Sequence, residues 1–526
     1  MNKTVVLNGS DLTIEDIIAI GFGLKTITID PDSIERCRES RKFLNSKISA
    51  KYIVYGVNTS FGPMSNKIID DSELEELQVN LIRSHAAGLG DPIPYYIAQG
   101  ALAVRLNTLV KGYSGVRIEL LEFMKVMINQ NIAPYIPECG SVGASGDLVH
   151  LSHLVLAIIG EGQVYYKSKL CNAKKLYSEL GITPIKLSYK EGLALINGTS
   201  IMTAIAAFTY FETKKLFNIA CVTCAFAVEI FGGINDAFDE DLACLKPHPG
   251  QITVSKIIQK LIEGSNNITA RHDIHESIRS QQSQGIVFET NIKVQDVYSI
   301  RCTPQILAPV IESIDYIKNT IQCEANSSND NPIIIPEKEK IIHGGNFHGQ
   351  SIAYAMDILS IAVSTICNLS ERRINKLLDK SLNEGLPEHL IFGTEGLAMG
   401  LMGAQYLATS CTAENRQMAN PVSIQTISCN ASNQDVVSMG TIAARKALNT
   451  VNNAKHVITV EVLADMQALS FRNSEKMGNP ISKIYKLLSE HFSVYDNKRT
   501  FHEDLVRFQH LLFSSQIFDN LSVYWK

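Results

Sequence analysis

One stretch dominates the interpretation of this sequence: residues 140–153, which read GSVGASGDLVHLSH. Its small residues let the backbone bend sharply, so that one amide can approach a neighbouring carbonyl. If the Gly146 nitrogen attacks the Ala144 carbonyl carbon and two waters are lost, one of them the Ser145 hydroxyl, the product is a methylidene-imidazolone, a strong electrophile. The structural alternative is a glycine-rich turn in which Ser145 or Asp147 caps the apolar helix that follows. The tripeptide alone does not decide between these interpretations.

Further along the chain, helical patterns dominate. Apolar residues recur at three- and four-residue spacing in three long segments, which predicts helices over residues 350–378, 400–418 and 434–469. The apolar segment 200–235 predicts a buried pair of helices. Helices of this length are typical of a helical bundle.

The N-terminal region is more mixed. A strand is predicted over residues 4–7, and a helix is predicted to end near His85, just before two glycines. We therefore predict a mainly α-helical fold with a long-helix bundle core and a smaller mixed N-terminal part that carries the Ala-Ser-Gly loop. The predicted boundary separates residues 1–205 from residues 206–526.

Composition excludes several classes of function. The 526 residues carry a formal net charge of -5, whereas nucleic-acid-binding proteins present a basic face, so we expect no nucleic-acid partner. No uninterrupted apolar run approaches the roughly 18 residues that span a bilayer, and the N-terminus lacks a secretory apolar core, so we expect a cytoplasmic protein outside membranes. The sequence has no phosphate-binding or dinucleotide-binding glycine motif and no complete set of metal ligands, so we predict neither a metal nor an external cofactor.

Polar residues interrupt the apolar pattern at three places. The loop 55–64 contains two glycines, an asparagine and a proline, and this irregular backbone holds Tyr55. His85 stands at a predicted helix end, where a lone histidine is more often structural. Asn197 breaks the apolar stretch 191–199 together with a glycine, and a polar break of this kind often faces a site.

Several short blocks keep one order along residues 55–435. Besides Ala-Ser-Gly they are Ile-Asn-Gly-Thr with Asn197, Gln-Asp-Val-Tyr-Ser with Gln295 and Tyr298, Asn-Asp-Asn-Pro with Asn331, Gly-Gly-Asn-Phe with Phe347, Ala-Glu-Asn-Arg with Glu414, and Asn433-Gln434-Asp435. Together these blocks resemble the aromatic amino acid ammonia-lyase and aminomutase family, whose members build the methylidene-imidazolone from Ala-Ser-Gly. One departure is Ser60, where the family usually has glycine, and it bears on the mobility of the loop.

Removing an α-amino group while taking a proton from the β-carbon requires an electrophile, a base and a carboxylate anchor. The resemblance implies that the electrophile, 4-methylidene-imidazol-5-one, forms from Ala144-Ser145-Gly146 without an external cofactor. It also implies that Tyr55 is the base, with support from Tyr298. Arg301 is the expected anchor, because a guanidinium can grip the substrate carboxylate with two parallel hydrogen bonds.

Other residues that resemble family positions are expected to contact the substrate or the prosthetic group. His85 is expected at the substrate ring, and Glu414 near the substrate amine. The remaining expected contacts are Asn197, Gln295, Asn331 and Phe347. The resemblance further implies a homotetramer in which several subunits contribute to each site.

The pair Ser84-His85 aligns with the residues that determine ring selectivity in this family. A Ser-His pair can bond an imidazole or a phenol, and histidine ammonia-lyases share the Ser-His-Ala-Ala-Gly of residues 84–88, so conversion of histidine to urocanate stays open. Blocks 420–423 and 433–437 resemble tyrosine ammonia-lyases and tyrosine 2,3-aminomutases instead. The first expectation is therefore L-tyrosine to 4-coumarate and ammonia, and Pro63 favours the lyase over the aminomutase that makes β-tyrosine. The alternative of another class is a non-catalytic helical scaffold.

Overall fold

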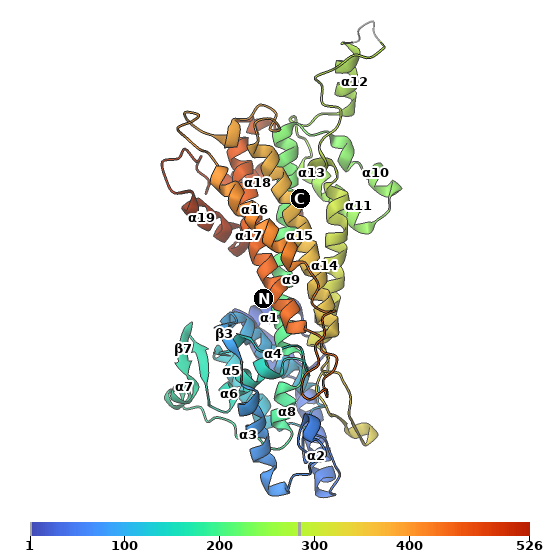
Figure 1. Ribbon diagram of the computed structural model, residues 1–526, viewed down its shortest axis with the longest axis vertical. Helices are drawn as coiled ribbons and strands as arrows, with labels where there is room; N and C mark the ends of the chain where they lie inside the picture. Colours follow the sequence, from blue (N-terminus) through green and yellow to red (C-terminus); the bar gives the residue numbers. More distant parts are fainter. Residues whose placement is uncertain (1–2, 282–285, 526) are drawn as a thin grey trace. The chain divides into compact units, whose positions relative to one another are not determined.

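The computed structural model describes residues 3–281 and 286–525. Contacts divide the chain into two compact units, and each unit is assembled from three segments that Figure 1 distinguishes by colour along the sequence. The first unit comprises Met1–Tyr210, Tyr316–Asp357 and Pro421–Leu448, and the second comprises Phe211–Asp315, Ile358–Asn420 and Asn449–Lys526.

This division differs from the predicted boundary after residue 205. The N-terminal segment of the first unit ends at Tyr210, but two later segments also belong to that unit. A single boundary along the sequence cannot describe a unit whose contacts join residues far apart in the chain.

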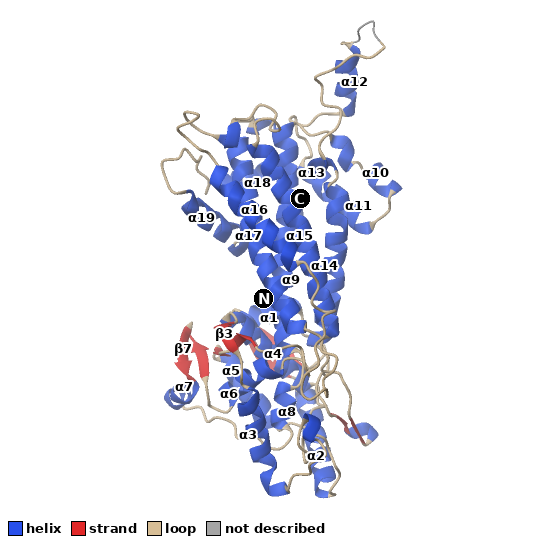
Figure 2. Cartoon of the chain, viewed as in Figure 1, coloured by secondary structure: helices blue, strands red, loops and turns tan. Residues whose placement is uncertain are grey.

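The first unit is mixed, and every strand that the described residues form belongs to it (Figure 2). Its strands are β1 Thr4–Leu7, β2 Thr26–Ile29, β3 Leu89–Pro92, β4 Ile132–Pro134, β5 Pro137–Cys139, β6 Gln163–Tyr166, β7 Lys169–Asn172, β8 Ile333–Ile335 and β9 Lys340–Ile342. Its helices include α1 Ile14–Gly21, α2 Pro31–Ser49, α3 Leu74–His85, α4 Tyr95–Val110, α5 Ile118–Asn129, α6 Leu148–Ile158, α7 Ala173–Leu180, α8 Glu191–Ile196 and the 3-10 helices η1 Gly62–Met64, η2 Asp71–Glu73 and η4 Pro336–Lys338. Strand β1 pairs with β2 in parallel, whereas β3–β5, β4–β6–β7 and β8–β9 are antiparallel.

The second unit is helical in the residues that the structure describes. Its own helices are α10 Glu240–Leu245, α11 Pro249–Leu261, α12 Arg271–Arg279, α13 Tyr298–Arg301, α16 Met402–Met418, α18 Asn479–Ser489, α19 Phe501–Ser514 and the 3-10 helices η3 Asn235–Phe238, η5 Glu388–Leu390, η6 Ser474–Lys476 and η7 Leu521–Trp525. Four long helices contribute residues to both units: α9 Ser200–Phe231, α14 Thr303–Ala325, α15 Gln350–Leu378 and α17 Gly440–Leu469.

Helix α4 forms the centre of the first unit. Every residue from Ile97 to Val110 is buried, and the helix packs against α1, α5 and β4. A helix that is apolar on all sides has to lie inside a core. Helix α4 also buries the polar residues Gln99, Asn107 and Thr108. It buries the charged Arg105 as well, and burial lowers the pKa of Arg105 to about 10.

Helices α9, α15, α16 and α17 pack together in the second unit (Figure 1). Ser370 on α15 donates to Glu461 on α17, and Arg373 on α15 donates to Thr223 on α9 at 2.9 Å. Asn415 on α16 donates to a backbone carbonyl of α17 at 3.0 Å. These contacts confirm the predicted bundle of long helices.

The long helices occur close to where periodicity predicts them. Helix α15 has the predicted bounds, but the predicted helix pair over 200–235 is wrong, because α9 continues to Phe231 without an internal glycine or proline. The helix predicted to begin at residue 434 begins only at Gly440. Just before it, Met439 has a φ of 56°, a left-handed conformation that an α-helix cannot contain.

Helix α15 also bears on the expectation that no segment spans a membrane. Among the described residues it is the helix that is long and apolar enough to cross a bilayer, and 72% of its most apolar window is buried inside the structure. Buried core helices share these properties, so α15 is weak evidence for a membrane span.

Candidate active site

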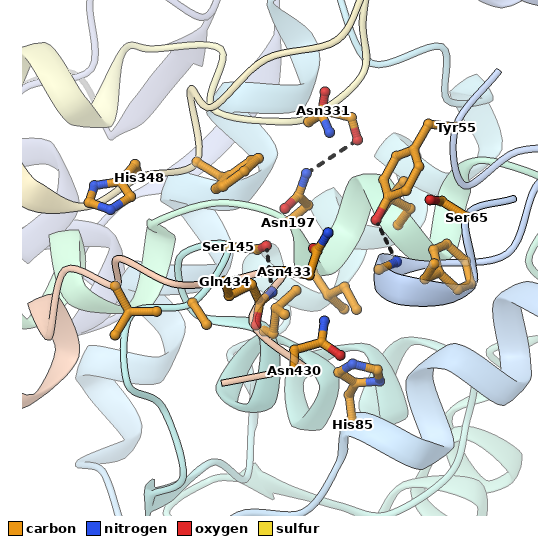
Figure 3. A pocket seen from close by; sticks show the side chains of 18 of the residues that line it. Tyr55, Ser65, His85, Ser145, Asn197, Asn331, His348, Asn430, Asn433 and Gln434 are labelled. Carbon is orange, nitrogen blue, oxygen red and sulfur yellow. Dashed lines mark hydrogen bonds between the residues drawn. The ribbon is translucent and has the colours of Figure 1, made fainter. Parts of the chain in front are cut away.

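A cavity of about 420 Å³ lies within the first unit. Figure 3 shows its side chains, which come from the loop at Tyr55, the end of α3 at His85, the turn at Ser145 and the segment around Asn433. Its other polar lining residues are Ser65, Asn197, Asn331, His343, His348, Asn430, Gln434 and Asp435. Ligand sites are typically concave with a few polar groups at defined positions, so this cavity is the candidate active site.

The Ala-Ser-Gly turn bends sharply at the cavity wall. Gly143, Ser145 and Gly146 have φ values of 79°, 47° and 80°, a left-handed region that is strained for serine. A Cβ at position 146 would lie 2.0 Å from the carbonyl oxygen of Gly198, so only glycine fits there. The Ser145 hydroxyl accepts a hydrogen bond from Gln434 Nε2 at 3.2 Å (Figure 3). A tight bend, an obligatory glycine and a serine hydroxyl at the cavity together fit a group formed by cyclisation of this tripeptide.

Asp147 fastens the turn to the start of α9. Its Oδ2 accepts the amides of Ile201 and Met202 at 2.9 and 3.0 Å, and its Oδ1 accepts the Thr441 hydroxyl at 2.6 Å. Burial raises the pKa of Asp147 to about 6, although these hydrogen bonds lower it. A carboxylate at this place satisfies free amides and faces the positive end of a long helix. Asp147 therefore caps α9, and its side chain makes no capping bond to α6.

Asn197 and Asn331 lie together in the cavity wall, as Figure 3 shows. Asn197 Nδ2 donates to the carbonyl oxygen of Asn331 at 3.2 Å, and Asn331 Oδ1 accepts the Gly344 amide at 2.9 Å. The Gly198 amide donates to the Ser145 carbonyl at 3.1 Å. Backbone and side-chain bonds thus join both predicted asparagines to the turn.

Tyr55 lines the cavity from the loop before η1. Its hydroxyl oxygen accepts the Gly62 amide at 3.0 Å, and its own amide donates to His343 Nε2 at 3.3 Å. Burial lowers the pKa of His343, and nearby Lys190 lowers it further, so the ring stays a neutral acceptor. The Phe61 ring stands edge-on to Tyr55 with centroids 6.4 Å apart. The phenol is therefore held in place, while its role as a base stays a prediction.

His85 ends helix α3 and also lines the cavity. Its Nδ1 lies 2.9 Å from the Leu81 carbonyl oxygen and 3.0 Å from the Ser84 hydroxyl. A carbonyl only accepts, so we assign the ring proton to Nδ1. In this tautomer of the imidazole Nε2 is the acceptor, and no hydrogen bond to it is formed within residues 3–281 and 286–525. A ligand that offers an N–H or O–H donor can pair with it.

Sequence reasoning missed several lining residues. Gln434 belongs to the block Asn433-Gln434-Asp435, which resembles the family but predicts no role for it. His343 and His348 flank the Gly-Gly-Asn-Phe block that contains Phe347, which lines the cavity as predicted. Asn430 gives no comparable signal. Its left-handed φ of 53° continues through the two following residues, and such a conformation depends on tertiary contacts.

Four predicted site residues belong to the second unit. Arg301 Nε donates to the carbonyl oxygen of Asp296 at 2.8 Å, and its guanidinium carbon lies 4.6 Å from the Tyr298 ring centroid. Gln295 and Arg301 line a pocket of about 350 Å³, whereas Glu414 is exposed on α16. The structure therefore groups Gln295, Tyr298 and Arg301 with one another within the second unit.

The described lining of the first-unit cavity contains an acidic side chain but no lysine or arginine. The acidic residue is Asp435. A substrate carboxylate therefore finds no cationic partner among the lining residues of this unit.

Comparisons with known proteins agree on one family. The family model "Aromatic amino acid lyase" matches residues 12–490. A histidine ammonia-lyase from Caldanaerobacter subterraneus subsp. tengcongensis is 41% identical over 490 residues, 93% of this chain and 92% of that protein. The crystal structure of a tyrosine aminomutase from Streptomyces globisporus is 34% identical, covers 98% of both chains and has a TM-score of 0.94. A histidine ammonia-lyase structure from Trypanosoma cruzi is 33% identical, covers 99% of this chain and 96% of that chain, and has a TM-score of 0.88.

These relatives correct the predicted substrate. Blocks 420–423 and 433–437 predict tyrosine, but the sequence relatives at about 40% identity over nearly the whole chain are named histidine ammonia-lyases. The prediction of tyrosine as the main substrate is therefore wrong. Blocks 420–423 and 433–437 are too short to identify the substrate. His85, the residue expected at the substrate ring, does not identify it either, because it can bond an imidazole as well as a phenol.

The matches also decide between an enzyme and a non-catalytic scaffold. The family model describes carbon–nitrogen lyases, and the relatives carry the names of such enzymes. Both match almost the full length of this chain. Enzymes of this family depend on a methylidene-imidazolone group. With its helical fold and its Ala-Ser-Gly turn, this chain belongs to the aromatic amino acid lyase family.

Proposed function

We propose that this protein is a histidine ammonia-lyase, which converts L-histidine to urocanate and ammonia. The observation that carries the proposal is the 41% identity over 93% of the chain with a protein of that name. His85 supports it, because the tautomer with the proton on Nδ1 leaves Nε2 free to accept the N–H of a substrate imidazole. A phenyl ring would leave this acceptor unpaired, which disfavours phenylalanine by about tenfold or more.

The prosthetic group is proposed to form from Ala144-Ser145-Gly146. When formed, the methylidene-imidazolone supplies an electrophile for the substrate amine. Gln434 holds the Ser145 side chain, and the Gly198 amide holds the Ser145 carbonyl. Asp147 fixes the end of the turn against α9. The chain's own contribution is therefore a turn held in a strained conformation next to the substrate cavity.

Tyr55 is proposed to take the proton from the substrate β-carbon. The Gly62 amide points at its hydroxyl oxygen and stabilises the negative charge that this oxygen carries when it acts as a base. His343 holds the Tyr55 backbone by accepting its amide. The supporting role of Tyr298 stays a prediction.

Arg301 is proposed to bind the substrate carboxylate. Its Nε is occupied by the Asp296 carbonyl, while its two terminal nitrogens have no hydrogen-bond partner in the described part of the chain. This free pair matches the two oxygens of a carboxylate. Gln295 and Glu414 complete the proposed contacts to the carboxylate and the amine.

We further propose that the active enzyme is a homotetramer in which different copies supply the two groups of residues. The cavity lining has no cation of its own, and the free guanidinium belongs to the second unit. Co-expression of a Tyr55→Phe chain with an Arg301→Lys chain tests this proposal. Mixed oligomers should regain part of the wild-type kcat/KM for L-histidine and exceed the kcat/KM of both variants alone. No regain would show that each site is made by one chain.

Product analysis tests the proposed reaction. The purified protein is incubated separately with L-histidine, L-tyrosine and L-phenylalanine, and the products are separated by chromatography. We expect urocanate and equimolar ammonia from L-histidine. A β-amino acid as the main product would make the protein an aminomutase, and 4-coumarate as the main product would overturn the histidine assignment. The cytoplasmic location stays a prediction that cell fractionation would test.

A further inference from the structure

Helix α13 carries Tyr298 and Arg301 but has only four residues. A helix of one turn is not stable by itself, and the last four carbonyls of any helix lack partners within it. The Cys302 amide, directly after α13, donates to the Tyr298 carbonyl at 3.0 Å. The Ser299 and Ile300 carbonyls also accept hydrogen bonds from side chains outside the helix.

Arg373 on α15 supplies one such contact from the bundle core. Its side chain is fully buried, and Nη1 donates to the Ser299 carbonyl of α13 at 3.4 Å. Nη2 donates to the Thr223 hydroxyl at 2.9 Å, and Nε donates to Glu461. All three nitrogens of the guanidinium therefore donate hydrogen bonds, which fixes the orientation of its plane.

Two further side chains reach the same short helix. The Thr303 hydroxyl donates to the Ser299 carbonyl at 3.1 Å, and the Cys224 thiol donates to the Ile300 carbonyl at 3.9 Å. Of these donors only Arg373 carries a charge. A cation at the C-terminal carbonyls of a helix is also favoured by the helix dipole.

Burying the Arg373–Glu461 ion pair in the bundle core costs desolvation free energy. Apolar side chains of similar volume often give equal or greater stability than a buried ion pair. Burial lowers the pKa of Arg373, but Glu461 raises it overall, so the guanidinium stays charged. Burial and Glu461 raise the pKa of Asp465 well above its usual range, and the ion pair of Arg373 is made with Glu461. Packing alone does not require this arrangement.

The contact of Arg373 with α13 suggests a role for the Arg373–Glu461 ion pair. Ser299 lies between Asp296, whose carbonyl binds Arg301 Nε, and Arg301 itself. If the Ser299 carbonyl shifts, the turn that aims the free guanidinium nitrogens shifts with it. We propose that Arg373, held by Glu461, is a positioning residue that fixes α13 so that Arg301 presents its two terminal nitrogens to the substrate carboxylate. This inference rests on the proposed role of Arg301.

Arg373→Lys tests the inference, because lysine keeps the charge for Glu461 but cannot also reach Ser299 and Thr223. Amide hydrogen exchange over residues 295–305 should become faster, while exchange in α17 stays close to the wild-type rate. The KM for L-histidine should rise about tenfold with kcat changed less than about threefold, because the carboxylate is bound alike before and during the reaction. Arg372→Lys is the matched control, since Arg372 is exposed and pairs with its neighbour Glu371.

The two measurements separate this inference from the proposed function. Unchanged exchange over 295–305 in a folded Arg373→Lys protein overturns the positioning role, as does a fall in kcat with KM unchanged. If the wild type does not act on histidine, the proposed function fails, and the exchange measurement still decides whether Arg373 holds α13. If Arg373→Lys does not fold, Thr223→Val removes one anchor of Arg373 and should give the same pattern with a KM increase of about threefold.

Discussion

The Ala-Ser-Gly turn and helix α13 are held in different ways. The turn is fixed by two backbone bonds with Gly198, whose amide donates to the Ser145 carbonyl and whose carbonyl accepts the Asp147 amide, and by the Asp147 carboxylate. Helix α13 is fixed by side chains that reach its carbonyls, with Arg373 as the charged one. Backbone contacts survive most substitutions nearby, whereas a contact made by one side chain is lost with it. The two regions should therefore respond to mutation by different amounts and in different kinetic constants.

The largest expected effect comes from Ser145→Ala in the turn. Without the hydroxyl the electrophile cannot form, and turnover should fall by at least about 10³-fold. Intact mass spectrometry should find the wild type lighter than its encoded mass by two waters, and the variant at its encoded mass. Ser152→Ala in α6 is the matched control and should keep the mass deficit. A wild type at its full encoded mass would refute the proposed group.

Tyr55→Phe should have the next largest effect. The change removes only the hydroxyl of the proposed base, so kcat should fall by about 10²- to 10⁴-fold while the mass deficit persists. Initial rates with L-histidine measure this, with Tyr298→Phe as the companion variant in the second unit. Near wild-type turnover in Tyr55→Phe together with a large loss in Tyr298→Phe would transfer the base to α13.

Arg301→Lys should act mainly on binding. Lysine keeps the charge but offers no planar pair of donors, so the KM for L-histidine should rise about tenfold or more. The mass deficit should stay intact, because the turn lies in the other unit. Steady-state kinetics with an unchanged KM would remove Arg301 from the substrate site.

The smallest effect concerns stability against acid. Burial lowers the pKa of His150 in α6 to about 4, and its Nε2 lies 3.1 Å from the Glu138 carbonyl. The unfolded chain binds this proton near pH 6.5, so stability falls as the pH drops from 6.5 towards 4, by about 2 kcal/mol at pH 5. His150→Gln should remove that part of the loss in thermal midpoint between pH 7.5 and pH 5. The half-buried His456 of the second unit, whose pKa burial also lowers, should give a smaller change in His456→Gln.

The fold could be predicted where local periodicity determines it. The bounds of α15 follow from its apolar spacing, but the start of α17 does not, because Met439 before it is left-handed and donates its amide to the Val142 carbonyl, far away in the sequence. The two units were not predictable as units, since residues 316–357 and 421–448 join the N-terminal segment through contacts that leave no local pattern.

The residues of the candidate site were likewise predictable only in part. Tyr55, His85 and Asn197 were predicted and line one cavity, because glycine turns and helix ends mark them in the sequence. Arg301 was also predicted, but it belongs to the second unit and lines a different pocket. His343 was missed because its role is a single bond to a backbone amide far away in sequence. The substrate was predicted wrongly because the acceptor that His85 offers suits two different rings.

The most direct test of the central claim is a competition in one vessel. Equal concentrations of L-histidine and L-tyrosine are added to the wild-type protein, and both sets of products are measured at early times by chromatography. The ratio of initial rates then equals the ratio of the two kcat/KM values. Our account predicts urocanate in excess of all tyrosine products by about tenfold or more. An excess of 4-coumarate or β-tyrosine over urocanate would contradict it.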